Sequence, residues 1–121
     1  PQLLDNIRVL LYQGQFDWKD GAAQNEKWLN QIDWEGKEGY LSAHRDIWMT
    51  PTALDNTKDV FMSMSTSVEY EYAGWVQSYA TLTELVVNGA GHLAPMDQPQ
   101  RLLAMITAFV QNKPFATKEA K

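Results

Sequence analysis

Two short apolar runs constrain the fold of this chain most strongly, because each one leads directly into a loop that contains glycine. The first run covers residues 7–12, is rich in β-branched and large apolar side chains, and is followed by Gly14. The second covers residues 82–87 and is followed by the small residues 88–91. The near-continuous first run is typical of a strand buried on both faces, as in a parallel sheet, and the second, which includes Thr83 and Glu84, has the composition of a strand. The pattern therefore predicts two strands, each with a loop at its carboxyl end.

The rest of the chain predicts helices and one further strand. A helix is predicted over residues 20–32, with Asp20 in a position to cap it, and the clearest helical spacing covers 99–112. Two shorter helices are predicted over 40–49 and 52–64. Residues 69–78 are predicted to be extended and to form a hairpin with 82–87 through a turn at 79–81.

Strands that alternate with helices predict an α/β fold over residues 1–121. A doubly wound sheet needs more strands than this chain offers. We therefore expect few strands flanked by helices, in a sheet that is incomplete on its N-terminal side. The aromatic content agrees, because five Trp, five Tyr and four Phe are many rings for 121 residues to hide.

Charge and composition argue against several functions. The formal net charge is −5 and no basic run is interleaved with aromatics, so nucleic-acid binding is not expected. No apolar stretch approaches the roughly 20 residues that span a bilayer, so no membrane span is predicted. The first residues lack a basic segment followed by an apolar run, so no signal peptide is predicted. Cysteine is absent, which rules out a disulfide framework, a thiolate nucleophile and a cysteine-based metal site.

An aspartate and a histidine follow the two apolar runs. Asp17 lies in the loop after the first run and His92 in the loop after the second. Taken alone, such an aspartate is more often a turn or cap residue, and a lone histidine is more often structural. In open α/β sheets, however, ligands bind at the carboxyl ends of the strands. If the two strands run parallel, Asp17 and His92 meet at that edge as the acid and base of a catalytic triad.

The nucleophile of such a triad is not recognisable in this chain. An α/β-hydrolase places it in a Gly-x-Ser-x-Gly elbow, and its triad runs in the order Ser, Asp, His. The chain has the last two members in that order but no such elbow. Its serines are Ser42, Ser63, Ser65, Ser67 and Ser78, and none has the flanking glycines.

Residues 88–99, Asn-Gly-Ala-Gly-His-Leu-Ala-Pro-Met-Asp-Gln-Pro, resemble the histidine motif of serine carboxypeptidases. In that motif Gly-Ala-Gly-His is followed by a proline and then by Asp-Gln-Pro. Residues 9–17 are similar to the strand and loop that carry the triad aspartate of the family. The resemblance extends over roughly residues 7 to 115. It implies the C-terminal portion of an α/β-hydrolase fold.

The resemblance also implies an activity. A serine carboxypeptidase removes C-terminal residues from peptides by acyl transfer through a serine ester, and it needs no metal or organic cofactor. His92 would be the general base and then the general acid, and Asp17 would orient it. Leu93 and Ala94 stand where many members have Met-Val, and they are expected to line the substrate site. Gln15 replaces a common aspartate, a form similar to the vitellogenic carboxypeptidase-like branch of the family.

The family further implies partners and a compartment. The nucleophile, the oxyanion hole and the groups that bind the substrate carboxylate belong to the N-terminal part or large chain of the enzyme. Such enzymes are lysosomal, vacuolar or secreted, and a homodimer is one expected assembly. Without the serine, this chain alone is expected to be inactive.

Two alternatives stay open. Acyltransferases and lyases exist on the same scaffold, so fold-level analogy does not separate them from peptidases. The other alternative is a non-catalytic module that self-associates to cover an exposed sheet edge. Among the remaining residues, His44 is expected on the surface of a helix, Phe61, Met62 and Met64 are expected in packing, and Glu69 and Glu71 are expected on a solvated edge.

Overall fold

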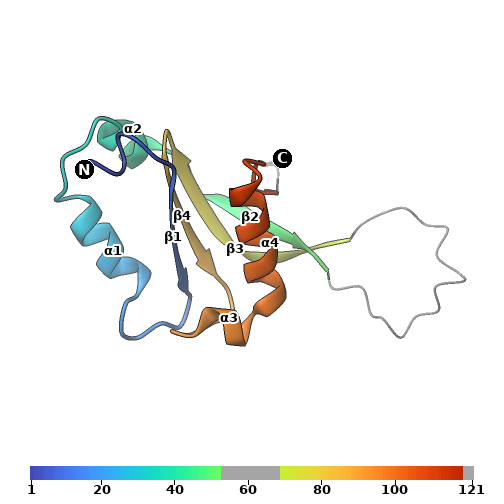
Figure 1. Cartoon of the computed structure of the whole chain (residues 1–121). Coiled ribbons are helices and arrows are strands. Elements are labelled where there is room, and N and C mark those ends of the chain that lie inside the picture. Colours follow the sequence, from blue (N-terminus) through green and yellow to red (C-terminus); the bar gives the residue numbers. More distant parts are fainter. Residues whose placement is uncertain (53–68, 119–121) are drawn as a thin grey trace, which may run out of the picture.

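A computed structural model describes residues 1–52 and 69–118 (Figure 1). Its centre is a four-stranded mixed sheet in the order β1-β4-β3-β2. The strands are β1 (Val9–Gly14), β2 (Asp46–Pro51), β3 (Tyr70–Tyr79) and β4 (Leu82–Val87). β1 pairs with β4 in parallel, whereas β3 pairs antiparallel with both β4 and β2. The fold class is therefore α/β, as predicted, and the expected parallel pair is present.

Helices cover both faces of the sheet (Figure 1). They are α1 (Ala22–Leu29), α2 (Lys37–Ser42), α3 (Ala94–Asp97) and α4 (Pro99–Val110). α1 and α2 lie on one face and α4 on the other. Within the described ranges, no helix is long and apolar enough to cross a membrane.

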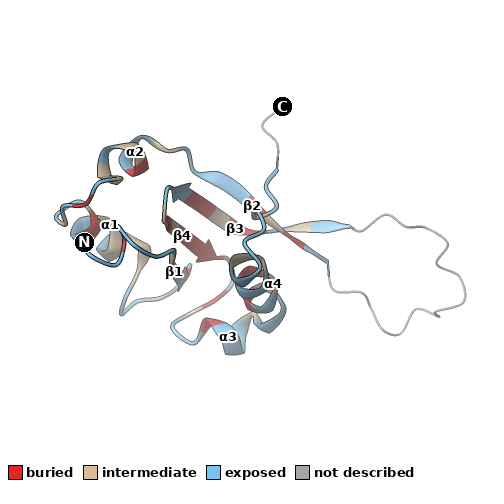
Figure 2. Cartoon of the chain, turned by 45° about the horizontal axis from the view of Figure 1, so that its top comes forward, coloured by how far each residue is buried: buried red, intermediate tan, exposed pale blue. Residues whose placement is uncertain are grey.

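The alternation of side chains along the strands supplies a core on each face. On the α4 side, Leu85 and Val87 of β4 pack with Leu102 and Met105. On the other side, the buried cluster is Leu4, Leu29, Trp34, Tyr40 and Leu82. Because neighbouring strand residues point to opposite faces, an apolar run such as β4 can serve both cores. Figure 2 shows how strongly burial is concentrated in β3 and β4.

The structure confirms the predicted hairpin and the last helix. β3 and β4 pair from Gly74 opposite Val87 to Tyr79 opposite Leu82, and α4 begins at Pro99. The predicted helix over 20–32 is shorter, because α1 covers Ala22–Leu29 and its N-cap is Gly21 rather than Asp20.

The predicted helix over 40–49 is wrong. α2 ends at Ser42, and Asp46–Pro51 forms the edge strand β2. As a strand, this segment pairs its backbone with β3 and places Trp48 in the core on the α4 side, whereas Tyr40 packs in the opposite core. One helix could not serve both faces of the sheet. His44 is exposed as expected, but it lies in the connection between α2 and β2 rather than on a helix.

Two further predictions concern the Glu69 and Glu71 edge and the helix over 52–64. Glu69 is exposed, but Glu71 forms a salt bridge with Arg101 of α4 at 3.1 Å, so the edge is not merely solvated there. The helix predicted over 52–64, apart from its first residue, lies outside the described residues, as do Phe61, Met62 and Met64.

Candidate active site

The loops that follow β1 and β4 meet at one edge of the sheet. The parallel register places Gly14 opposite Val87, so the two strands end side by side. Two backbone hydrogen bonds then join the loops: the amide of Gln15 donates to the Val87 carbonyl, and that of Phe16 donates to the Ala90 carbonyl, each at 2.9 Å. These contacts bring Asp17 and His92 together although they are far apart in the chain.

Gly14 permits this close approach. A Cβ atom at this position would lie 2.2 Å from the carbonyl oxygen of Gly91 and 2.3 Å from that of Ala90. Both neighbours are backbone atoms, which cannot move aside without displacing the loop. The glycine that ends the first apolar run is therefore required by the packing of the two loops.

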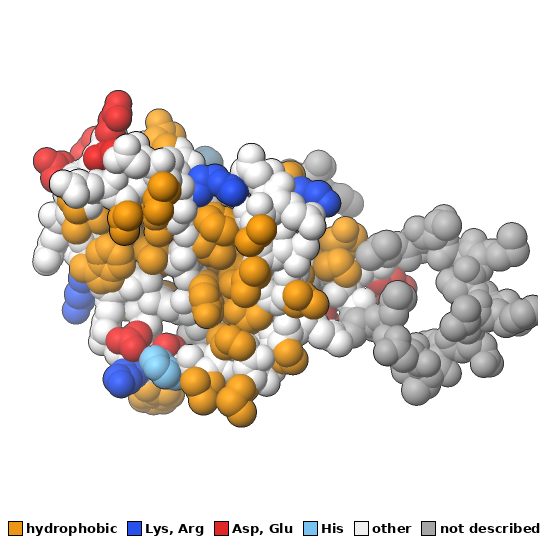
Figure 3. All heavy atoms as spheres, in the orientation of Figure 1, with side chains coloured by type: hydrophobic (Ala, Val, Ile, Leu, Met, Phe, Trp, Pro, Cys, Tyr) orange, Lys and Arg blue, Asp and Glu red, His pale blue; other side chains and the backbone are white. Residues whose placement is uncertain are grey.

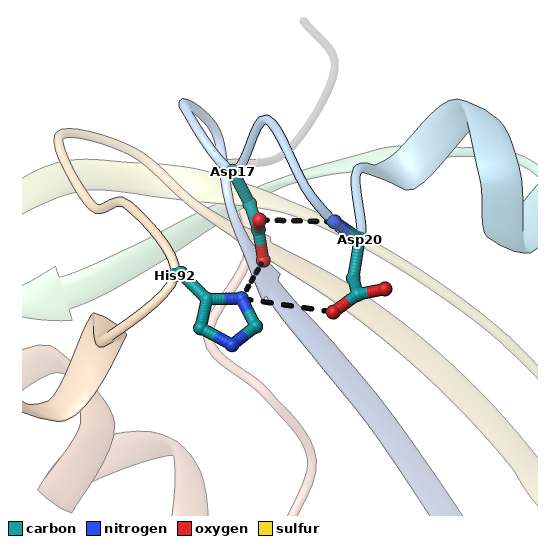
Figure 4. A group of neighbouring side chains, drawn as sticks. All are labelled: Asp17, Asp20 and His92. Atoms are coloured by element: carbon teal, nitrogen blue, oxygen red, sulfur yellow. Dashed lines mark hydrogen bonds and ion pairs between the residues drawn. The ribbon is translucent and has the colours of Figure 1, made fainter.

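Asp17 is a nearly buried carboxylate with both oxygens occupied. Its side chain is 5% exposed. Oδ1 accepts hydrogen bonds from the amides of Lys19 and Asp20, each at 3.0 Å, and Oδ2 lies 3.0 Å from Nδ1 of His92 (Figure 4). The Asp20 amide and, to a smaller extent, the His92 and Lys19 hydrogen bonds lower the pKa of Asp17 from 3.8, although burial opposes them. Asp17 is therefore an ionised acceptor.

His92 presents its second ring nitrogen outward. Because the Asp17 carboxylate only accepts hydrogen bonds, Nδ1 must carry a proton, and in the neutral imidazole this leaves a lone pair on Nε2. In Figure 4 this nitrogen points away from both carboxylates, and the side chain is 53% exposed. The geometry is that of an oriented base with a free proton acceptor.

Asp20 contributes a second carboxylate that the sequence pattern assigned to helix capping. Its Oδ2 lies 3.7 Å from the same Nδ1 of His92, and its side chain is 60% exposed. The sequence offered one signal for this role, since Asp20 follows Asp17 by three positions in the same loop. That signal is weak, because an aspartate just before a helix more often caps it.

The Asp-Gln-Pro part of the histidine motif supports the loop. The carboxylate of Asp97 accepts a hydrogen bond from the Gly91 amide at 2.7 Å. The side-chain amide of Gln98 donates to the Gly89 carbonyl at 3.3 Å, and Arg101 donates to the Asn88 carbonyl at 2.9 Å. Side chains from α3, α4 and the residue between them thus hold the backbone that leads into His92.

The other predicted site residues lie as follows. Leu93 is 59% exposed next to His92, whereas Ala94 is 1% exposed and packs in the core on the α4 side. Of the serines, Ser42 donates to the Glu38 carbonyl, and Ser78 donates to Thr83 near the start of β4, away from His92. Ser63, Ser65 and Ser67 lie outside the described residues.

Asp17, Asp20 and His92 also form a group whose potential ligand atoms lie within 4.8 Å of one another. The histidine atom that faces both carboxylates is Nδ1, and the ionised Asp17 already holds its proton in a hydrogen bond. The contacts therefore favour a hydrogen-bonded pair over a metal site.

Comparison with known proteins shows which family the chain belongs to. The family described as serine carboxypeptidase matches residues 1–112. The chain belongs to the serine carboxypeptidase family. Its strands and helices are accordingly part of an α/β-hydrolase fold.

Individual relatives agree. The chain is 38% identical over 115 residues to a probable serine carboxypeptidase CPVL of Dictyostelium discoideum. The matched residues make up 95% of the chain and 20% of that protein. It is 34% identical to the venom serine carboxypeptidase of Apis mellifera and 31% identical to the human probable serine carboxypeptidase CPVL, each over 93% of the chain and 20% of the relative. The chain thus spans about a fifth of the length of these relatives.

Proposed function

We propose that this chain supplies the acid and base of a serine-type carboxypeptidase, which removes C-terminal residues from peptides. The observation that carries the proposal is the 3.0 Å contact between a nearly buried, ionised Asp17 and Nδ1 of His92, at the joint carboxyl end of two parallel strands. Membership of the serine carboxypeptidase family supports the reaction type.

In the proposed reaction, a serine outside this chain attacks the last peptide carbonyl of the substrate and transfers its proton to Nε2 of His92. The imidazolium, stabilised by Asp17, then gives the proton to the leaving amine, which departs as the C-terminal amino acid. Water then attacks the acyl-enzyme, with the same proton transfers through His92, and releases the shortened peptide. Each step uses His92 as a proton carrier and consumes no cofactor.

Leu93 is the neighbour of His92 that we propose to contact the substrate, because it is exposed beside the imidazole whereas Ala94 lies in the core. An apolar side chain in that position would favour peptides with an apolar residue near the bond that is cleaved. Ala94 would act indirectly, by packing the loop.

We propose that the serine belongs to the remaining, N-terminal part of a larger protein that packs on this chain. Figure 3 shows hydrophobic side chains gathered on the face where β1 lies between α1 and α4. The exposed apolar residues include Ile7 and Tyr12 around β1 and Leu103, Ile106 and Val110 on α4. Contiguous apolar surface of this kind marks an interaction site. A homodimer and a lysosomal, vacuolar or secreted location belong to the same proposal, by analogy with the family.

The proposal is tested with a blocked dipeptide and two preparations. The full-length protein should release the C-terminal amino acid, and the 121-residue chain should not. Removal of the nucleophile from a comparable triad costs on the order of a million-fold in rate. Cleavage by the isolated chain that His92→Ala abolishes would contradict the assignment of the nucleophile to another segment.

Product analysis separates the peptidase from its relatives on the same scaffold. A peptidase gives a free amino acid and a shortened peptide. Transfer of the acyl group to an added alcohol or amine in preference to water would instead identify an acyltransferase.

A further inference from the structure

Asp20 faces the same nitrogen of His92 that Asp17 binds. Its Oδ2 is 3.7 Å from Nδ1, against 3.0 Å for Asp17. Figure 4 shows both carboxylates on the Nδ1 side of the imidazole, with Asp20 approaching from the segment that leads into α1. The imidazolium formed during catalysis would therefore be adjacent to two negative charges rather than one.

The backbone and the side chain of Asp20 act separately. Its amide donates a 3.0 Å hydrogen bond to Oδ1 of Asp17 and helps to fix that carboxylate. Any residue except proline supplies such an amide, so this contact alone does not require an aspartate. The carboxylate is not used by the helix either, because Gly21 is the N-cap of α1 and no side-chain cap is formed.

We propose that Asp20 is a positioning residue for the reaction of His92. Its amide holds Asp17 in place, and its carboxylate limits rotation of the imidazole and stabilises the imidazolium. The inference rests on the proposed function in so far as His92 is the base of the reaction. The contact between Asp20 and His92 does not depend on which reaction the base serves.

The other charged groups around this loop do not replace Asp20. Lys19 follows Asp17 and donates its backbone amide to that carboxylate. Asp97 of α3 accepts the Gly91 amide, so its carboxylate is engaged with the loop backbone. Among the described residues, Asp17 and Asp20 are the carboxylates recorded in ionic contact with His92.

The expected effect is small because Asp20 is exposed. An exposed ion pair contributes roughly 0.2–1 kcal/mol, which corresponds to a factor of about 1.4 to 5. Asp20→Asn keeps the amide and the shape but removes the charge. In the full-length protein we expect kcat at its plateau to fall about two- to threefold with KM unchanged. The acidic limb of the kcat/KM profile should move to lower pH, because the imidazolium has lost one stabilising charge.

A second readout is independent of activity. Diethyl pyrocarbonate acylates the neutral imidazole, and peptide mass spectrometry resolves His92 from His44, the two histidines of this segment. At a pH low enough for most His92 rings to be protonated, Asp20→Asn should raise the modification rate of His92 about two- to threefold, by the same reasoning on exposed ion pairs, and leave that of His44 unchanged. Asp33→Asn is the matched control, because this exposed aspartate lies beyond the far end of α1 and its loss changes the net charge equally.

The salt dependence of His92 reactivity and the Asp33→Asn control decide whether the proposal holds. A gain in His92 reactivity that disappears in 1 M salt supports the proposal, since salt screens contacts between exposed charges. Equal reactivity in Asp20→Asn and Asp33→Asn, or a gain that persists undiminished in 1 M salt, would overturn it. If the full-length protein shows no peptidase activity but the reactivity gain is present, the proposed function fails and the role of Asp20 stands.

Discussion

At the scale of single residues, the site depends on an asymmetry between Asp17 and His92. The aspartate is nearly enclosed and accepts three hydrogen bonds, whereas half of the histidine side chain is open. The enclosed partner fixes the tautomer, and the open partner can reach a substrate. The same environment lowers the pKa of Asp17, so the acceptor stays ionised in mildly acidic solution.

Replacement of Asp17 by asparagine tests this division of roles. The Asp17→Asn variant of the full-length protein should fold, since the shape is kept, but its amide can bind the wrong tautomer of His92. We expect kcat to fall by a factor on the order of 10⁴ with KM nearly unchanged, the loss known for this substitution in a comparable triad. Steady-state kinetics on a blocked dipeptide measures it. A loss of less than tenfold would mean that Asp17 does not orient the base.

At the scale of elements, the site is made by the parallel pair β1 and β4 and by the packing of the loops that follow. This part of the fold could be predicted from the sequence, because each strand is an apolar run that stops at glycine and small residues. The α4 helix could likewise be predicted, from the helical spacing of its apolar residues. β2 was not, since residues 46–51 gain their strand structure from pairing with β3 and from burial of Trp48, neither of which a local pattern contains.

Gly14 provides a prediction at this scale. In Gly14→Ala, a Cβ atom 2.2 Å from the Gly91 carbonyl oxygen should force the β1 and β4 loops apart. Overpacking of this kind costs roughly 1–3 kcal/mol of stability. We expect a lower thermal midpoint and a loss of kcat, because the Asp17–His92 contact must lengthen. A variant with wild-type midpoint and kcat would show that the loops tolerate the extra atom.

At the scale of the whole molecule, the buried carboxyl of Glu84 lies under α1 and α2, on the face of the sheet opposite α4. Glu84 is 1% exposed, and Tyr40 donates a 2.7 Å hydrogen bond to its Oε2. Within the described part of the chain its Oε1 has no hydrogen-bond partner. Burial raises the pKa of Glu84 from its ordinary 4.5, although the Tyr40 hydrogen bond opposes this change. The neighbouring Arg45 is already paired with Glu26.

The shift has a defined consequence for stability. Because the folded state holds this proton more tightly than the unfolded state, its contribution is fully present below pH 4.5 and is lost as the pH rises through the folded pKa. Glu84→Gln removes the titration while keeping the shape. The free energy of unfolding of the variant, relative to wild type, should therefore increase between pH 4.5 and neutral pH.

Urea unfolding of the full-length protein at several pH values measures this difference. Glu38→Gln on the exposed surface of α2 is the matched control, because it makes the same substitution at an exposed position. A Glu84→Gln difference that does not change with pH would mean that Glu84 titrates alike in the folded and unfolded states.

Like β2, the candidate site was only partly predictable from the sequence, because some of its residues owe their roles to tertiary packing. Asp17 and His92 stand in recognisable loops, whereas the role of Asp20 depends on the direction of its side chain relative to a histidine from another loop. The burial of Ala94 next to the exposed Leu93 likewise depends on how α3 packs. A motif marks the residues, but packing decides which of them are exposed and which are buried.

The central claim is that Asp17 and His92 activate a serine that lies outside this chain. A fluorophosphonate probe, which labels activated serines, tests it most directly when the labelled peptide of the full-length protein is located by mass spectrometry. We predict one labelled serine outside these 121 residues, with labelling lost in His92→Ala and strongly reduced in Asp17→Asn. Labelling of a serine within the chain, or labelling that is undiminished in His92→Ala, would contradict the account.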